Sequence, residues 1–295
     1  MAEAVTKQMA TGPLPAFARI LLVTDFSACS EAAAPVARLL AESYDGTVTA
    51  AHVILRDQDL GSNEAVIGTP EEIAALAEDQ MAAFLAKNSL SAAESIIASG
   101  PFEETIANLV TDKQIDALVV GTHGRSAVGK IVLGSVAQRI FNSVACPVVT
   151  VSGKARMSSW MGTKLTKILY ATNMSEISVK ALPYALSLAK AHNAELLLAY
   201  APEDSARDEC HNQDLAELIP PAARSWCRFA QTSVKGDAAS GIVELAASNA
   251  VDLIVIGTER LTAGPLYRFN VPFTTAYQIV ANATCPVLRC ASHVG

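Results

Sequence analysis

Short apolar runs alternate with longer segments of helical spacing along the first half of this 295-residue chain. The run 19–24 predicts a strand, and Ser30–Tyr44 predicts a helix because its apolar residues recur along one side. The same pattern predicts further strands at Thr47–Ile54, Ser95–Ser99, Leu118–Gly121 and Pro147–Val151, and further helices at Pro70–Lys87, at Phe102–Asp112 and from Ser135. Strands that alternate with helices favour an α/β fold with a parallel sheet and helices on both faces.

The second half of the chain repeats the landmarks of the first half in the same order. The matched segments are Arg19–Ser27 with Lys167–Ser175, Asp116–Thr122 with Asp252–Thr258, and Cys146–Val148 with Cys285–Val287. Their offsets are 148, 136 and 139 residues, so the two copies differ by short insertions or deletions. We therefore expect a tandem duplication of a unit much longer than a solenoid repeat.

This duplication predicts the domain organisation. Two α/β units are expected at 19–151 and 167–295, each a doubly wound five-stranded parallel sheet with ligands at the edge where the strand order reverses. Residues 1–18 lack the apolar core of a secretory signal and are predicted to be a disordered arm. The segment 152–166 contains Gly, Ser and Lys and is predicted to be a linker that runs over the surface.

Composition narrows the class of protein. Hydrophobic residues make up 51% and charged residues 17%, which argues against disorder. A net charge of -7 argues against a nucleic-acid binder, and no apolar run is long enough for a membrane helix. The six cysteines form no C-x-x-C pair and are expected to be reduced, in a cytoplasmic protein. Cys146 and Cys285 are predicted to pack as small apolar residues at the start of a last strand.

A glycine-rich loop lies between the strand that ends at Gly121 and the helix expected from Ser135. Its sequence over 121–136, GTHGRSAVGKIVLGSV, has the spacing Gly-x2-Gly-x9-Gly-Ser. Backbone N–H groups and a helix N-terminus in this order can face a phosphate. Gly121 and Gly124 are able to take positive φ and admit close approach of the backbone, and Ser135 is placed to cap the helix.

The charge around this loop also favours an anionic ligand. No Asp or Glu occurs between Gly121 and Ser175, whereas that stretch holds seven basic residues: Arg125, Lys130, Arg139, Lys154, Arg156, Lys164 and Lys167. Such a stretch suits a polyanion such as a triphosphate. A basic linker whose charges are simply solvated is an equally good interpretation.

A second phosphate motif overlaps the loop but fails in one position. Gly124–Ile131 has the spacing of the phosphate loop of P-loop NTPases and matches it in every required position but the last. There Ile131 stands where that loop needs a Ser or Thr to bind Mg²⁺. Because Ile has no oxygen ligand for a hard cation, this class is disfavoured.

The loop spacing, between a strand and a helix, resembles the nucleotide loop of the ATP-binding universal stress proteins. The resemblance covers nearly all of Arg19–Arg289, and it implies two adenine nucleotide alpha hydrolase-like, Rossmann-like domains related by a pseudo-two-fold axis. It also implies that ATP, with or without Mg²⁺, is held by the loop glycines and Ser135, while Asp25 contacts the base or the ribose. The implied nucleotide-binding residues are Val23, Thr24, Asp25, Val53, Val120, Gly121, His123, Gly124, Arg125, Gly134, Ser135 and Val136.

Three polar residues near this site have a second interpretation. Asp25 can cap the turn that follows it, a role that is compatible with ligand binding. His52 is expected to be structural, because a lone strand histidine rarely carries chemistry by itself. Lys130 could reach the phosphates as a mobile charge, but a solvated lysine is equally compatible with the sequence.

The second half departs from the loop pattern. Arg260 stands at the second glycine position, and counting back from Cys285 puts Phe273 at the third glycine and Thr274 at the serine. A Phe at a helix entrance would block a phosphate, and Glu259 would repel it. We therefore predict that the second unit, in which Asn173 replaces Asp25, does not bind ATP in the manner of this family.

The sequence favours a nucleotide-dependent regulatory protein of the stress response over an efficient enzyme. No carboxylate in the loop or the next helix could hold a metal or orient water, and at most weak ATP hydrolysis is expected. One alternative is a slow ATPase or nucleotide-transferring enzyme on the same fold, and another is an interaction module with a vestigial loop. The former would show Ser-Gly-Gly after strand one, where this chain has Asp25-Phe-Ser-Ala28.

The expected partners are an adenine nucleotide and an unidentified protein, with neither nucleic acid nor membrane. By resemblance, the last strands of the two units, Pro147–Val151 and Pro286–Arg289, are predicted to pair within the chain as a pseudo-dimer. This pairing would cover two edge strands, and whole chains could also form a homodimer.

Overall fold

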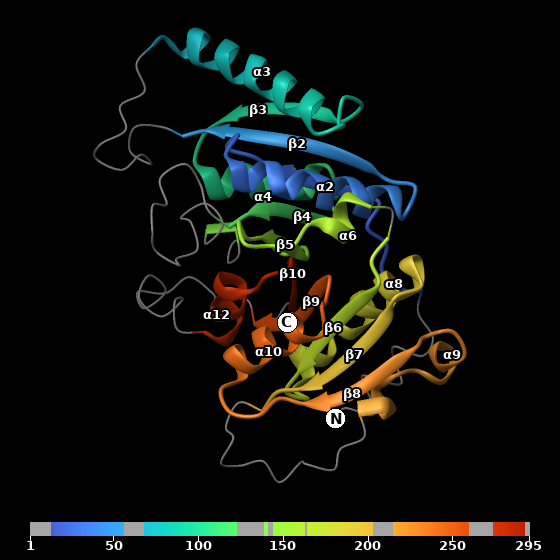
Figure 1. Cartoon of the computed structure of the whole chain (residues 1–295). Coiled ribbons are helices and arrows are strands. Elements are labelled where there is room, and N and C mark those ends of the chain that lie inside the picture. Colours follow the sequence, from blue (N-terminus) through green and yellow to red (C-terminus); the bar gives the residue numbers. More distant parts are fainter. Residues whose placement is uncertain are drawn as a thin grey trace.

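The computed structural model describes residues 13–55, 68–122, 139–140, 144–162, 164–202, 215–259 and 274–292. The strands in these residues are β1 (Arg19–Val23), β2 (Thr47–Ile54), β3 (Glu94–Ser99), β4 (Ala117–Gly121), β5 (Val148–Val151), β6 (Lys167–Thr172), β7 (Glu195–Tyr200), β8 (Phe229–Ser233), β9 (Leu253–Glu259) and β10 (Val287–Ser292). They form a single ten-stranded sheet in the order β3-β2-β1-β4-β5-β10-β9-β6-β7-β8, which runs from the top to the bottom of Figure 1.

Helices cover both faces of this sheet. They are α2 (Ala28–Glu42), α3 (Pro70–Lys87), α4 (Phe102–Asp112), α6 (Ser158–Met161), α7 (Glu176–Val179), α8 (Leu182–His192), α9 (Pro221–Arg224), α10 (Ala238–Ser248) and α12 (Thr275–Asn282), with a 3₁₀ turn, η2, at Leu215–Leu218. Helices α2, α3 and α8 bury their apolar residues in one core cluster, and α4, α10 and α12 bury theirs in a second cluster on the opposite face. The sheet is therefore the middle layer of three.

The two halves have the same topology and meet through one antiparallel strand pair. Within each half, all neighbouring strands are parallel, and the strand orders β3-β2-β1-β4-β5 and β8-β7-β6-β9-β10 correspond. Strand β5 pairs with β10 in the antiparallel sense, with Val149 opposite Leu288. The predicted doubly wound α/β fold and the predicted pairing of the last strands are both confirmed.

Local sequence signals explain why several elements begin and end where the pattern predicted. The bounds of β2, α3 and α4 coincide with the predicted ones. Helix α3 begins after Thr69, whose side chain accepts a hydrogen bond from the backbone of Glu72, while the Glu72 side chain accepts one from the backbone of Thr69. Pro70 then occupies the first turn, where it sacrifices no helical hydrogen bond.

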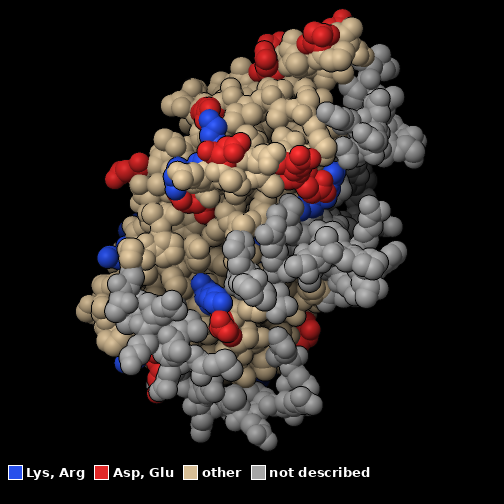
Figure 2. All heavy atoms as spheres, turned by 180° about the vertical axis from the view of Figure 1, so that it is seen from behind, with Lys and Arg blue, Asp and Glu red and all other residues tan. Residues whose placement is uncertain are grey.

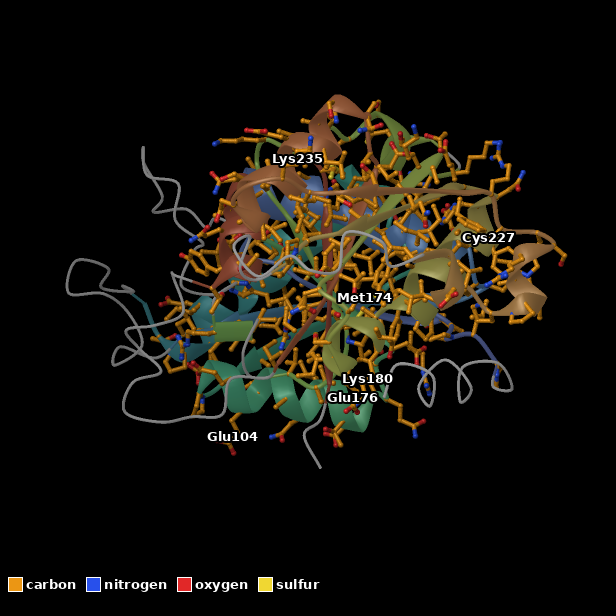
Figure 3. The ribbon with its side chains drawn as sticks, turned by 90° about the horizontal axis from the view of Figure 1, so that it is seen from below. Glu104, Met174, Glu176, Lys180, Cys227 and Lys235 are labelled. Carbon is orange, nitrogen blue, oxygen red and sulfur yellow. The ribbon has the colours of Figure 1, made fainter. Side chains whose placement is uncertain are left out.

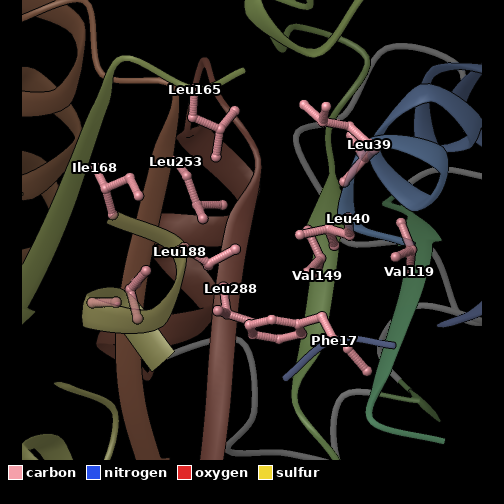
Figure 4. Packing of buried hydrophobic residues seen from close by; sticks show 14 of the residues in the cluster. Phe17, Leu39, Leu40, Val119, Val149, Leu165, Ile168, Leu188, Leu253 and Leu288 are labelled. Atoms are coloured by element: carbon pink, nitrogen blue, oxygen red, sulfur yellow. The ribbon is translucent and has the colours of Figure 1, made fainter. Parts of the chain in front are cut away.

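The end of the predicted disordered arm is instead packed between the two halves. Phe17 is fully buried, and its ring centroid lies 5.5 Å from that of Tyr44 and 5.9 Å from that of Tyr184. Figure 4 shows its ring between Val149 on β5 and Leu288 on β10. Burial of this ring offsets the entropy of ordering the segment. The prediction of disorder is wrong for 13–18, and 1–12 lie outside the described residues.

The predicted surface linker is also packed against the protein. Its helix α6 buries Trp160 completely, and the indole Nε1 donates a hydrogen bond to the backbone oxygen of Asp252 at 2.9 Å. The Asp252 carboxylate accepts hydrogen bonds from the backbone and hydroxyl of Thr166 at 2.7 and 2.8 Å. This segment therefore holds the start of β6 against the start of β9 and does not run freely over the surface.

The remaining bulk predictions concern cysteines and membranes. Among the described residues the cysteines are free, and burial raises the pKa of Cys146 and of Cys285 to about 12, so both pack as small apolar groups. None of the helices in the described ranges is both long and apolar enough to span a bilayer.

Candidate functional site

The corner between β1 and α2 is built around Asp25. Its Oδ1 accepts hydrogen bonds from the Ser30 hydroxyl at 2.6 Å and from the Ser27 backbone N–H at 3.0 Å. Burial alone would raise the pKa of Asp25, but the hydrogen bonds from Ser27 and Ser30 outweigh it and hold the pKa below its usual value. The predicted role of Asp25 in capping the turn is confirmed, and the side chain carries a negative charge at neutral pH.

Thr24 and His52 fix the backbone of the same corner. Phe26 has a φ of 62°, in the left-handed region, and its N–H donates to the Thr24 hydroxyl at 2.9 Å. His52 Nδ1 lies 2.8 Å from the backbone oxygen of Thr24, and its ring stacks on Phe26 with centroids 4.6 Å apart. Because a carbonyl oxygen can only accept, Nδ1 carries a proton. These contacts give His52 the structural role predicted for it.

Three valines lie together at the carboxyl ends of neighbouring strands. Val23 on β1 stands opposite Val120 on β4, and Val53 lies near the end of β2 on the same face. All three belong to the second core cluster and are buried. The structure therefore brings these predicted site residues to one sheet edge, beside Asp25.

Gly121 admits a close approach of the backbone, as predicted, but without a positive φ. It does not adopt a positive φ, unlike Gly68, Gly100 and Gly236. A Cβ at this position would lie 2.7 Å from the carbonyl carbon of Cys29, in the first turn of α2. The small residue thus admits the helix backbone, and Gly257 has the same relationship to Ile177, whose oxygen would lie 2.5 Å from the added Cβ.

The rest of the predicted loop site is outside the described residues. This applies to His123, Gly124, Arg125, Gly134, Ser135 and Val136. Beyond the loop, Arg139 is described, and its guanidinium binds the carboxylate of Glu103 with Nη2–Oε2 at 2.6 Å. The carboxylate-free stretch therefore receives a carboxylate from α4, which offsets part of its positive charge. On the face seen in Figure 2, acidic and basic side chains of the described residues are interspersed.

The same sheet edge in the second half contains a cavity that the sequence pattern did not predict. Its volume is about 530 Å³, and it lies between the ends of β6, β7 and β9 and the first turn of α12. Thr274 caps α12 by accepting a hydrogen bond from the N–H of Tyr277 at 3.3 Å, in the position predicted to correspond to Ser135. Asn173 accepts a hydrogen bond from the N–H of Ser175 at 3.1 Å, which reproduces the turn of Asp25.

Comparison with known families agrees with this architecture. The family model for the Universal stress protein family matches residues 16–152. A universal stress protein of Methanocaldococcus jannaschii is 30% identical over 142 residues, which are 46% of this chain and 82% of that protein. The chain belongs to the universal stress protein family. A second universal stress protein, from Thermus aquaticus, is 30% identical over 139 residues, which are 46% of this chain and 98% of the relative.

Solved structures extend the comparison to both halves of this family member. A universal stress protein from Archaeoglobus fulgidus superposes with a TM-score of 0.73 at 17% identity, covering 96% of this chain and 99% of the other. A protein of unknown function from Pseudomonas aeruginosa superposes with a TM-score of 0.59 at 15% identity, covering 97% of this chain and 94% of the other. At these identities the superpositions establish the fold, in which the tandem arrangement recurs.

Proposed function

We propose that this universal stress protein binds ATP in its amino-terminal half and acts as a nucleotide-dependent regulatory protein in the stress response, with little or no hydrolysis. The observation that carries the proposal is the convergence of Asp25 and the three valines at the edge where the glycine loop 121–136 begins. In this proposal, 19–151 and 167–295 are the two domains of a cytoplasmic protein.

The described residues fit the base and ribose of such a ligand. Val23, Val53 and Val120 supply an apolar layer of the kind that lines small-molecule sites. The hydrogen bonds from Ser27 and Ser30 end on Oδ1 of Asp25, so Oδ2 can accept one from a ribose hydroxyl or a base amine. These residues would bind and orient the nucleoside part, and they provide no nucleophile.

In this proposal the glycine-rich loop binds the phosphates. Main-chain N–H groups of 121–136, together with the helix expected from Ser135, would bind the phosphate oxygens, with or without Mg²⁺. Within the described residues, no three His, Cys, Asp or Glu side chains gather into a possible metal site. A bound Mg²⁺ would therefore take its ligands largely from phosphate and water.

ATP would act by stabilising one state of the amino-terminal half. A ligand that binds the folded, ordered state shifts the equilibrium towards it in proportion to its concentration over its Kd. The state so selected could then differ in its affinity for a protein partner or for a second copy of the chain.

Calorimetric titration with ATP tests this proposal. The variant Gly124→Val should weaken ATP binding at least tenfold, because a branched side chain would exclude phosphate from the loop backbone. Arg260 occupies the corresponding position of the second half, so Arg260→Val is the matched control and should leave the affinity unchanged. Equal ATP affinities of the wild type and Gly124→Val would contradict the proposal.

A further inference from the structure

We infer that the cavity of the carboxyl-terminal half is a second binding site, selective for an uncharged ligand of nucleoside size that has an apolar ring face and hydroxyl groups. The inference goes beyond the proposed function, because it concerns the half in which ATP binding is not expected. It is carried by the cavity itself and by the chemistry of its walls.

Two residues that line the cavity are smaller than their counterparts in the first half. Gly100 and Gly236, both with positive φ, precede helices α4 and α10, each of 11 residues. Phe102 begins α4, whereas Ala238 begins α10 and lines the cavity. The second half thus carries a methyl group at the position where the first half carries a buried aromatic ring.

A second replacement enlarges the same space. Val23 and Ala171 are equivalent in the repeated segments, and they pair with Ala51 and Ala199 on the next strand. Val53 and Ala201 each lie two residues after these partners and are therefore equivalent. Ala201 lines the cavity. The resulting volume of about 530 Å³ lies within the range of about 300–1,000 Å³ that is typical of small-molecule sites.

The walls are suited to a ligand without charge. The cavity-lining residues within the described part of the chain are all uncharged, and Asn173 stands where the first half has Asp25. Glu176 begins α7, and Lys180 directly follows that helix. Their side chains pair at 2.8 Å, and Figure 3 labels them next to each other. Neither residue lines the cavity. Burying an anion against these described residues would remove it from water without a compensating cation among them, which is unfavourable.

Apolar and polar groups are divided within the cavity. Ile242, Ile256 and Ile279 provide an apolar surface against which a ring can pack. Thr172, Ser178 and Thr258 provide hydroxyl groups. Thr172 and Ser178 are linked to each other with oxygens 2.7 Å apart, so their positions are fixed before a ligand enters. A neutral nucleoside matches this pattern, whereas a nucleotide adds charge that none of the described lining residues pairs.

Adenosine is the probe, and the Gly124→Val background removes the phosphate contacts of the proposed ATP site but leaves its nucleoside contacts in place. Calorimetry in this background should show an adenosine site of the carboxyl-terminal half, identified by its response to substitutions in the cavity wall. Adding Ala238→Phe, which installs the residue of the first half at a helix position that tolerates it, should weaken adenosine binding at least tenfold. Ala201→Val, a smaller intrusion that copies Val53 of the first half, should weaken it to a lesser extent.

The outcomes separate this inference from the proposed function. Absence of adenosine binding in Gly124→Val, or equal affinity with and without Ala238→Phe, would overturn the inference, as would equally tight binding of AMP to this site. The single variant Ala238→Phe should retain wild-type ATP affinity, which also shows that it folds. Failure of the proposed function would show instead as ATP binding that Gly124→Val does not weaken.

Discussion

Phe102 and Ala238 occupy equivalent positions at the start of α4 and α10, so an aromatic ring in the first half corresponds to a methyl group in the second. The Phe102 ring is buried, and the guanidinium carbon of Arg139 lies 5.3 Å from its centroid. Arg139 is in turn held by Glu103. The second half lacks this aromatic ring, and Ala238 instead lines the cavity at its sheet edge.

Truncating the ring should destabilise the first half. Phe102→Ala removes a buried aromatic side chain and its contact with Arg139, so we expect a loss of about 3–5 kcal/mol in the free energy of unfolding. Urea denaturation followed by circular dichroism measures this loss. The reverse exchange, Ala238→Phe, fills an existing space and should cost less than about 1 kcal/mol. Similar effects of the two variants would show that the positions are not packed differently.

Gly121 and Gly257 should tolerate no side chain, because each lies against the backbone of a helix start. An added Cβ would lie 2.7 Å from the Cys29 carbonyl carbon at Gly121, and 2.5 Å from the Ile177 oxygen at Gly257. We expect Gly121→Ala and Gly257→Ala each to cost about 2 kcal/mol or more, since backbone cannot move aside cheaply. Thermal unfolding provides the measurement. The control is Gly153→Ala, where the added Cβ would lie 3.3 Å from the Cys29 Sγ, and its effect should be small.

The Asp252 carboxylate should be a main attachment of the segment between the halves. Asp252→Ala leaves the N–H groups of Thr166 and Lys167, now bonded at 2.7 and 3.0 Å, without this acceptor. We expect a loss of about 2–4 kcal/mol in unfolding free energy, together with faster proteolysis near α6. Thr166→Val removes the hydroxyl bond alone and should cost about 1 kcal/mol. If Asp252→Ala unfolds at the same urea concentration as the wild type, this segment does not contribute to stability.

Stability should fall on mild acidification because of His192. Burial lowers the pKa of His192 from 6.5 to about 4, and its Nε2 lies 3.3 Å from the Ser43 hydroxyl of the other half. Between these two pKa values the unfolded chain binds a proton that the folded protein does not, so unfolding becomes easier as the pH drops from 6.5 towards 4. At about 1.4 kcal/mol per pKa unit, the shift from 6.5 to about 4 contributes at most about 3.5 kcal/mol.

A non-ionising variant isolates this contribution. In His192→Gln the difference in unfolding free energy between pH 7 and pH 5 should shrink, although the carboxylates of the protein still titrate. Urea unfolding at both pH values compares the two proteins. An unchanged pH dependence in His192→Gln would assign the acid sensitivity to other groups.

Elements with strong local signals could be predicted from the sequence. Helix α3 has a Thr69 cap and a first-turn Pro70, and the alternation of strands and helices was sufficient to predict parallel sheets with helices on both faces. The turn role of Asp25 followed from the same local chemistry. These features depend on residues close in sequence, which is why the pattern contained them.

Other features depend on contacts between distant residues. Phe17 and Trp160 lie outside the predicted strands and helices, and each packs against a residue of the second half, Tyr184 and Asp252 respectively. The pairing of Arg139 with Glu103 joins side chains 36 positions apart in the sequence. The equivalence of Phe102 and Ala238 becomes visible only when the strands of the two half-sheets are aligned. The loop motif contains neither residue and could not reveal it.

Equilibrium dialysis of the purified chain against labelled ATP tests the central claim most directly. The account predicts one ATP per chain at saturation, lost in Gly124→Val and retained in Ala238→Phe. Two ATP per chain, or a single ATP that survives Gly124→Val, would contradict it.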